Sequence, residues 1–174
     1  RRVPGRGATL VTAWRTRQFE STWLRTAMHR YADFWTVTEE ALAFAAEATG
    51  VVLTASQRAE LMAAYLSLAA YPDVRPALTT LKAAGLRLAI LTNLSPRMLD
   101  AAARSAGLVD LFERRLSTDA ARTYKPDPLA YRLAVDALGL SREEIGFVAS
   151  AGWDAAGGTA YGFPTFWVNR PGQI

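Results

Sequence analysis

The stretch Leu-Arg-Leu-Ala-Ile-Leu-Thr-Asn-Leu-Ser-Pro-Arg, residues 86–97, predicts a strand that runs directly into a helix. Its first half is mostly apolar, as a buried strand requires. Ser95 and Pro96 then fit the N-cap and the first position of a helix. Thr92 and Asn93 lie between the two elements, at the carboxyl end of the strand. Open α/β sheets bind ligands at that end, so these two polar residues predict a functional site.

The same arrangement recurs twice further along the chain. Lys125 lies in the loop that follows Leu-Ser-Thr at residues 116–118, and Asp154 follows the apolar segment 146–150. A threonine, a lysine and an aspartate, each beyond a predicted strand, would meet at one edge of a parallel sheet. This pattern indicates a site rather than packing.

The pattern of predicted elements changes from helices alone to alternating helices and strands near residue 71, where Tyr-Pro-Asp interrupts the helical pattern. Residues 1–7 resemble a loop. The other predicted elements before the break are helices at 8–31, 36–50 and 54–68. The second and third of these helices begin with capping boxes, at Thr36 and at Thr54. After it we expect helices at 74–84, 96–106, 128–138 and 153–161, alternating with strands at 86–91, 112–117, 145–149 and 164–168. A third capping box begins at Ser141. Helix–strand alternation predicts an α/β fold with a parallel sheet covered by helices on both faces.

Composition narrows the chemistry that the chain can carry. The 174 residues contain no cysteine, which excludes disulfides, thiolate metal sites and a cysteine nucleophile. The single histidine, His29, cannot form a histidine metal site alone. No apolar run approaches ~18 residues, so we expect no membrane span. The net charge of +4 comes from scattered arginines, which fits a small anionic substrate, and we expect no nucleic-acid partner.

Four segments together resemble the haloacid dehalogenase superfamily, and within it the L-2-haloacid dehalogenases. They are Trp-Arg-Thr-Arg-Gln-Phe-Glu at 14–20 with Thr-Trp-Leu-Arg at 22–25, Leu-Thr-Asn-Leu-Ser-Pro at 91–96, Tyr-Lys-Pro-Asp at 124–127 with Tyr131, and Phe-Val-Ala-Ser-Ala-Gly-Trp-Asp at 147–154 with Gly-Phe-Pro-Thr at 162–165. The first is similar to the first cap helix of those enzymes and the others to the second, third and fourth superfamily motifs. Their order and spacing, across nearly the whole chain, make the resemblance specific.

The resemblance implies a Rossmann-like parallel sheet with an inserted helical cap. Residues 1–71 would form the cap and residues 72–174 a partial core. The first motif of the superfamily, a strand ending in an aspartate nucleophile, would lie upstream of Arg1. We therefore expect the chain to be a fragment whose sheet lacks its first strand and which is inactive alone.

The resemblance also implies an activity. Family enzymes hydrolyse L-2-haloalkanoic acids to 2-hydroxy acids through an ester on the aspartate, without a metal or another cofactor. The expected partner is thus a small halogenated carboxylic acid. We further expect a cytoplasmic homodimer.

Four residues match the family's catalytic positions. Arg15 would bind the departing halide, because a guanidinium is always charged and weakly hydrated. Thr92 would hydrogen-bond the substrate carboxylate. Lys125 would pair with the nucleophile or with the substrate carboxylate, and Asp154 would steer the hydrolytic water or hold Lys125. Each of the four also has a plainer interpretation. Arg15 could be an ordinary exposed arginine, and Thr92 could belong to a turn at the end of its strand. Lys125 could be a solvated loop lysine, and Asp154 could be an acid that stabilises a helix N-terminus.

Five further residues match substrate-binding positions. Phe19, Phe34 and Trp153 would form a dry wall around the haloalkyl group, although aromatic residues at helical spacing also fit plain core packing. Asn93 would shape the loop after its strand, or act only as a local cap. Tyr131 would orient Lys125, with ordinary packing as the alternative.

Two rival functions remain open on the sequence. Magnesium-dependent phosphatases of the same superfamily place two carboxylates about four residues apart in the fourth motif. Here Ser150 occupies the place of the first acid, and only Asp154 remains. The second rival is a remnant with a binding role or none. The chain also departs from many dehalogenases at Ala149 and Ala151, where those enzymes carry a serine and an asparagine that place the hydrolytic water.

Overall fold

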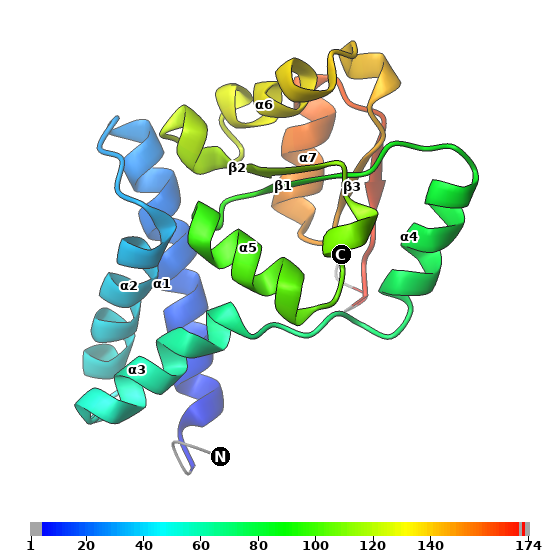
Figure 1. Cartoon of the computed structure of the whole chain (residues 1–174). Helices are drawn as coiled ribbons and strands as arrows, with labels where there is room; N and C mark the ends of the chain where they lie inside the picture. Colours follow the sequence, from blue (N-terminus) through cyan, green and yellow to red (C-terminus); the bar gives the residue numbers. More distant parts are fainter. Residues whose placement is uncertain (1–4, 171, 173–174) are drawn as a thin grey trace.

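The computed structural model describes residues 5–170 and 172 (Figure 1). Residues 1–4 of the predicted N-terminal loop lie outside the described residues. The α-helices are α1 (Gly7–Ala27), α2 (Phe34–Ala48), α3 (Ala55–Ala63), α4 (Val74–Ala83), α5 (Pro96–Ser105), α6 (Pro128–Leu138) and α7 (Gly152–Tyr161). The strands are β1 (Ala89–Thr92), β2 (Arg114–Ser117), β3 (Phe147–Ala149) and β4 (Thr165–Trp167), and short 3-10 turns lie at η1 (Ala64–Leu66), η2 (Val109–Leu111), η3 (Thr118–Ala121) and η4 (Arg142–Glu144).

The strands form two separate parallel pairs, β1 with β2 and β3 with β4. All are parallel, which confirms the predicted α/β class. The expectation of one sheet is not met, because within residues 5–170 no strand pairs with the free edge of β1 or of β3. Figure 1 shows both pairs at the centre of the molecule, with α5 and α7 beside them.

Most helix boundaries follow the sequence. One exception is α3, which ends at Ala63 and continues as η1 to Leu66 rather than reaching residue 68, and the others lie between α1 and α2. Helix α1 ends at Ala27 rather than near residue 31, and His29 then adopts a left-handed conformation with φ of 54°. The predicted capping box at Thr36 is wrong. Asp33 is the N-cap of α2, because its carboxylate accepts hydrogen bonds from the Trp35 and Thr36 amides at 2.9 and 3.2 Å.

Other capping signals are confirmed. The boxes that begin at Thr54 and Ser141 both form, and they open α3 and η4. Pro96 is the first residue of α5, as predicted, although the Ser95 side chain makes no capping hydrogen bond. Short-range sequence signals therefore determine where most elements begin.

Three clusters of buried side chains hold the molecule together. One lies among α1, α2 and α3 around Trp14 and Leu42, and a second lies among α6, α7 and β3 around Tyr131. The third connects these two parts, because Phe34 and Val37 of α2 pack with Met98 of α5 and with Tyr124. The Tyr124 hydroxyl also donates to the Ala32 carbonyl, so the α1–α2 connection is fixed to the sheet-bearing part.

The helical part lies to one side of the strands, as Figure 1 shows for α1, α2 and α3. Among the described residues the first strand begins only at Ala89. The division at residues 71 and 72 stays a prediction. None of the helices in the described ranges combines the length and apolarity that a membrane span needs.

Candidate active site

Lys125 lies at the centre of a buried polar cluster. Its side chain is almost fully buried, and its Nζ donates to Asp154 Oδ2 at 2.6 Å and to the Leu91 carbonyl at 3.2 Å. The ammonium also lies 5.3 Å from the centre of the Phe147 ring. The plainer interpretation, a solvated loop lysine, does not fit these contacts.

Asp154 holds Lys125 from the first turn of α7. Its second oxygen, Oδ1, accepts a hydrogen bond at 2.9 Å from the hydroxyl of Tyr131, a fully buried residue of α6. Both carboxylate oxygens are thus engaged by side chains. Asp154 also stabilises the positive end of the α7 helix dipole, so the two expected roles are compatible.

The close approach of α6 and α7 depends on Gly157. A Cβ at this position would collide with the Tyr131 hydroxyl and would lie 2.8 Å from Pro126 Cβ. The absence of a side chain therefore lets Tyr131 reach Asp154. Burial, together with the negative charge of Asp154, raises the pKa of Tyr131 above its usual value of 10.0, so the phenol stays a donor.

Asn93 connects β1 to the Lys125 loop. Its Oδ1 accepts from the Lys125 amide at 3.0 Å and from the buried Thr118 hydroxyl at 3.3 Å. These two bonds turn the amide oxygen inward and leave the Nδ2 donor without a hydrogen-bond partner among residues 5–170. The loop-shaping role that we expected for Asn93 fits this geometry.

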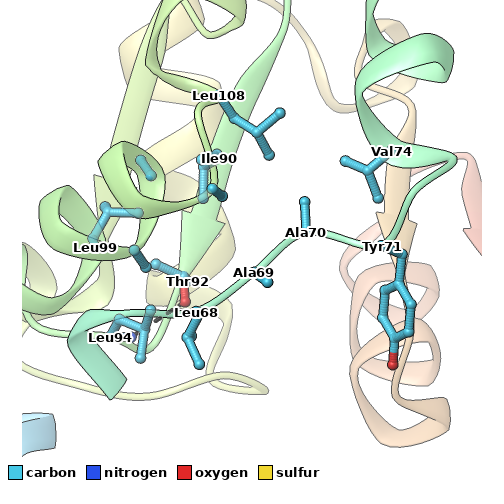
Figure 2. Close-up of a pocket in the computed structure, with 13 residues that line it drawn as sticks. Leu68, Ala69, Ala70, Tyr71, Val74, Ile90, Thr92, Leu94, Leu99 and Leu108 are labelled. Carbon is cyan, nitrogen blue, oxygen red and sulfur yellow. Dashed lines mark hydrogen bonds between the residues drawn. The ribbon is translucent and has the colours of Figure 1, made fainter. Parts of the chain in front are cut away.

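Thr92 lies beside the site in a more local role. Its Oγ1 accepts from the Leu94 amide at 3.3 Å, as in a strand-end turn. Figure 2 shows Thr92 among the residues that line a cavity, beside Leu68. The cavity has a volume of about 260 Å³ and is also lined by Ala69, Ala70 and Tyr71. The other lining side chains are mainly apolar, and neither Lys125 nor Asp154 belongs to them. This cavity is therefore not the centre of the chemistry.

Arg15 lies on α1 and is exposed. Its NH1 donates to Gln18 Oε1 at 2.9 Å, and its guanidinium lies 4.7 Å from the centre of the Phe19 ring. Among the described residues, no hydrogen bond or ion pair connects Arg15 with Lys125 or Asp154. The structure thus keeps the two expected charged centres separate.

An aromatic cluster connects the helical part with α7. Phe19 contacts Trp153 edge-on, with ring centres 5.4 Å apart, and Trp23 contacts Trp153 at 5.7 Å. Sequence reasoning missed Trp23 as a site residue, although its spacing of four residues after Phe19 could have indicated it. Phe34 lies elsewhere, buried against Tyr124 with ring centres 6.0 Å apart.

The donor set of the site suits a cation poorly. Within the described ranges, no group of three or more His, Cys, Asp or Glu side chains is placed to hold a metal ion. Asp154, the carboxylate at the fourth-motif position, already accepts from Lys125 and Tyr131. Ser150 stands where a second acid would be needed.

Comparisons with known proteins identify the family of the chain. A sequence model of the haloacid dehalogenase-like hydrolases matches residues 7–162. An (S)-2-haloacid dehalogenase from Pseudomonas sp. strain YL is 48% identical over 98% of this chain and 74% of its own. The crystal structure of the L-2-haloacid dehalogenase RSc1362 superposes with a TM-score of 0.98 at 43% identity, covering 99% of this chain and 78% of that one.

A further similar structure carries a bound molecule. It is the L-2-haloacid dehalogenase from Xanthobacter autotrophicus with chloropropionic acid covalently bound, at a TM-score of 0.90 and 43% identity, covering 96% of this chain and 67% of that one. The match to the family extends over the helical part and over strands β1, β2 and β3. The chain belongs to the haloacid dehalogenase-like hydrolases.

Proposed function

We propose that this protein hydrolyses L-2-haloalkanoic acids to 2-hydroxy acids, breaking a carbon–halogen bond. The observation that carries the proposal is the buried cluster in which Asp154 accepts from both Lys125 and Tyr131. It supplies one oriented ammonium at the ends of the strands. The substrate class rests on the relatives named above.

The reaction begins at an aspartate outside residues 1–174. Its carboxylate attacks the halogen-bearing carbon, an ester forms, and the carbon–halogen electron pair leaves with the halide. Water then attacks the ester carbonyl and releases the 2-hydroxy acid and the free carboxylate. The unpaired edges of β1 and β3 support a strand from that outside segment between them, which would bring its end beside Lys125.

The residues of this chain position the reactants. Lys125 holds the nucleophile and the substrate carboxylate together against their mutual repulsion. Asp154 fixes Lys125, and a carboxylate lone pair that neither Lys125 nor Tyr131 uses orients the hydrolytic water, since each carboxylate oxygen can accept two hydrogen bonds. Thr92 and the Nδ2 group of Asn93 donate to the substrate. Tyr131 holds Asp154.

The helical part binds the halide as it leaves and lines the substrate site. Arg15 binds the departing anion, and Phe19, Trp153 and Phe34 exclude water from the haloalkyl group. The contact between Phe19 and Trp153 supports a shared wall between α1 and α7. Phe34, which is buried against Tyr124, acts by fixing that wall to the sheet-bearing part.

A magnesium-dependent phosphatase is the less favoured function. Such an enzyme needs carboxylate oxygens that are free to bind the cation. Here Lys125 and Tyr131 occupy both oxygens of Asp154, which favours charge pairing over a cation. A non-catalytic remnant would have no use for a buried ion pair, since its desolvation costs several kcal/mol.

The assembly and compartment belong to the same proposal. We propose residues 1–71 as the cap, residues 72–174 as the larger part of the core, and a cytoplasmic homodimer. Exposed apolar side chains near the end of α1, Leu24 at 52% and Met28 at 57%, support an intermolecular contact. Light scattering of the full-length protein, with Leu24→Glu as the variant, tests the dimer.

The activity is tested by halide release from the full-length protein, which includes the segment before residue 1. We expect chloride from L-2-chloropropionate, much less from the D enantiomer, and none from residues 1–174 alone. Hydrolysis of p-nitrophenyl phosphate that requires magnesium, without chloride release, would establish the phosphatase instead. No turnover of either substrate would favour the remnant.

A further inference from the structure

A buried polar network lies behind Arg15, on the side facing the helical core. Gln18, one turn further along α1, is 0% exposed, and its Oε1 accepts from Arg15 NH1 at 2.9 Å. The hydroxyl of Tyr65 in η1 accepts from the same nitrogen at 3.3 Å and donates to Gln18 Oε1 at 3.4 Å. One terminal nitrogen of the guanidinium is therefore held from two sides.

Thr38 of α2 determines which way the Gln18 amide points. The buried Thr38 hydroxyl donates to the Phe34 carbonyl at 2.5 Å, so its lone pairs are left to accept from Gln18 Nε2 at 2.6 Å. A flipped amide would bring its NH₂ group against the guanidinium, donor against donor. The amide oxygen must therefore face Arg15.

The rest of the guanidinium is open. Among residues 5–170, Arg15 donates through NH1 alone, and its Nε and NH2 groups have no hydrogen-bond partner. The partners on the buried side are a neutral amide and a phenol. They orient the guanidinium without neutralising it, so its full positive charge stays available at the exposed Nε–NH2 edge.

We propose that Gln18 is a positioning residue that aims the open edge of Arg15 at the leaving halide, with Thr38 fixing the direction of its amide. This inference rests on the proposed dehalogenation. A neutral amide is required there because a carboxylate in its place would form an ion pair with Arg15. The halide would then compete with an internal anion for the same charge.

The experiment uses the full-length protein and two substrates that differ only in leaving group, L-2-chloropropionate and L-2-bromopropionate. Gln18→Met removes the hydrogen bonds at similar size, and Gln18→Glu keeps an acceptor but adds charge. Stopped-flow detection measures the rate of halide release in the first turnover, which reports departure of the halide even where ester hydrolysis limits kcat. We expect both variants to lower this rate for the chloro substrate by about tenfold to a hundredfold, as misplaced catalytic groups do. The loss should be smaller for the bromo substrate, because bromide leaves more readily and needs less stabilisation.

Thr22→Val is the matched control. Thr22 is also fully buried on α1, but its hydroxyl donates to the Phe19 carbonyl at 2.7 Å and does not contact Arg15. It should leave the chloro-to-bromo ratio of first-turnover halide release rates at the parent value. Thr38→Val should shift this ratio in the direction of Gln18→Met, and Thr38→Ser, which keeps the hydroxyl, should restore it. If Gln18→Met fails to fold, the comparison of Thr38→Val with Thr38→Ser tests whether Gln18 positions Arg15.

The outcomes separate the two proposals. An equal loss on both substrates, or no loss, in Gln18→Met and Thr38→Val would overturn the role of Gln18, provided that Arg15→Lys still lowers the first-turnover rate of halide release more for the chloro substrate. If the parent releases no halide, or if Arg15→Lys leaves both substrates unaffected, the proposed function or its halide site fails.

Discussion

The two charged centres of this molecule are built in opposite ways. Lys125 is buried, and its positive charge is balanced by Asp154, whose Oδ2 lies 2.6 Å from the Lys125 Nζ. Asp154 is itself held by a hydrogen bond from Tyr131. Arg15 is exposed, and its close partners are uncharged. The difference suggests that the core centre is assembled before substrate arrives, whereas the arginine keeps its charge for an anion that comes and goes.

The largest effect is expected from Lys125→Ala in the full-length protein. Removing the ammonium leaves the nucleophile and the substrate carboxylate repelling each other, so halide release should fall a hundredfold or more, on the order of 3 kcal/mol. Stopped-flow halide detection on mixing with L-2-chloropropionate measures this step. Near-normal turnover would return Lys125 to a structural role.

The second prediction concerns packing around the core centre. Gly157→Ala should destabilise the protein by about 1–3 kcal/mol, because the new methyl group displaces Tyr131 from Asp154. Gly7→Ala, where a Cβ meets no atom within 4 Å, should be neutral or slightly stabilising. Urea unfolding of both variants gives the comparison, and equal stabilities would show that α7 moves away at little cost.

The third prediction follows from the tyrosines. Burial, as the largest cause, raises the pKa values of Tyr31, Tyr124 and Tyr131 above 10.0. The folded state therefore keeps protons that the unfolded state loses above pH 10.0. The contribution of these tyrosines to the free energy of unfolding should be constant below that pH and fall as pH rises beyond it.

Tyr131→Phe should make this alkaline decline shallower, while lowering stability at neutral pH by about 1–2 kcal/mol through the lost hydrogen bond to a charged group. Tyr71→Phe is the control, since the Tyr71 side chain is 63% exposed. Urea unfolding at several pH values from 7 to 11 measures both slopes. Parallel curves for parent and Tyr131→Phe would contradict the cause given for the raised pKa.

The smallest effect is expected at Ala151. Ala149 and Ala151 stand where many L-2-haloacid dehalogenases carry hydrogen-bonding residues, so Asp154 orients the water with fewer partners. We predict that ester hydrolysis limits turnover, seen as a burst of halide followed by a slower steady rate. Ala151→Asn should shrink the burst and raise the steady rate a few-fold, about 1 kcal/mol in barrier. A single linear phase, unchanged by the substitution, would place the slow step elsewhere.

Local signals predicted most of the fold, and they failed where contacts are distant. Thr54, Pro96 and Ser141 begin their elements as expected, since capping involves neighbours only. Asp33 was missed because Thr36 offers a similar pattern three residues later. The pattern of each strand alone does not indicate how the strands pair, because pairing depends on which strands are present.

The candidate site also separates into residues with a local sequence signal and residues that depend on distant contacts. Lys125 and Asp154 were predicted because each follows a strand, and parallel strands bring such residues together. The sequence does not predict Gln18 as a site residue, because its proposed role depends on Thr38, which lies twenty residues away on another helix. A buried glutamine on an amphipathic helix has no sequence signal that separates it from an exposed one.

The central claim is that the reaction passes through an ester on a carboxylate of the protein. Intact-protein mass spectrometry tests it after the full-length protein is mixed with excess L-2-chloropropionate and quenched in acid within the burst phase. The account predicts a species heavier by one propionate unit that has lost its chlorine, located by digestion in a peptide from the segment before residue 1. Chloride release at the full rate with only unmodified protein would contradict it.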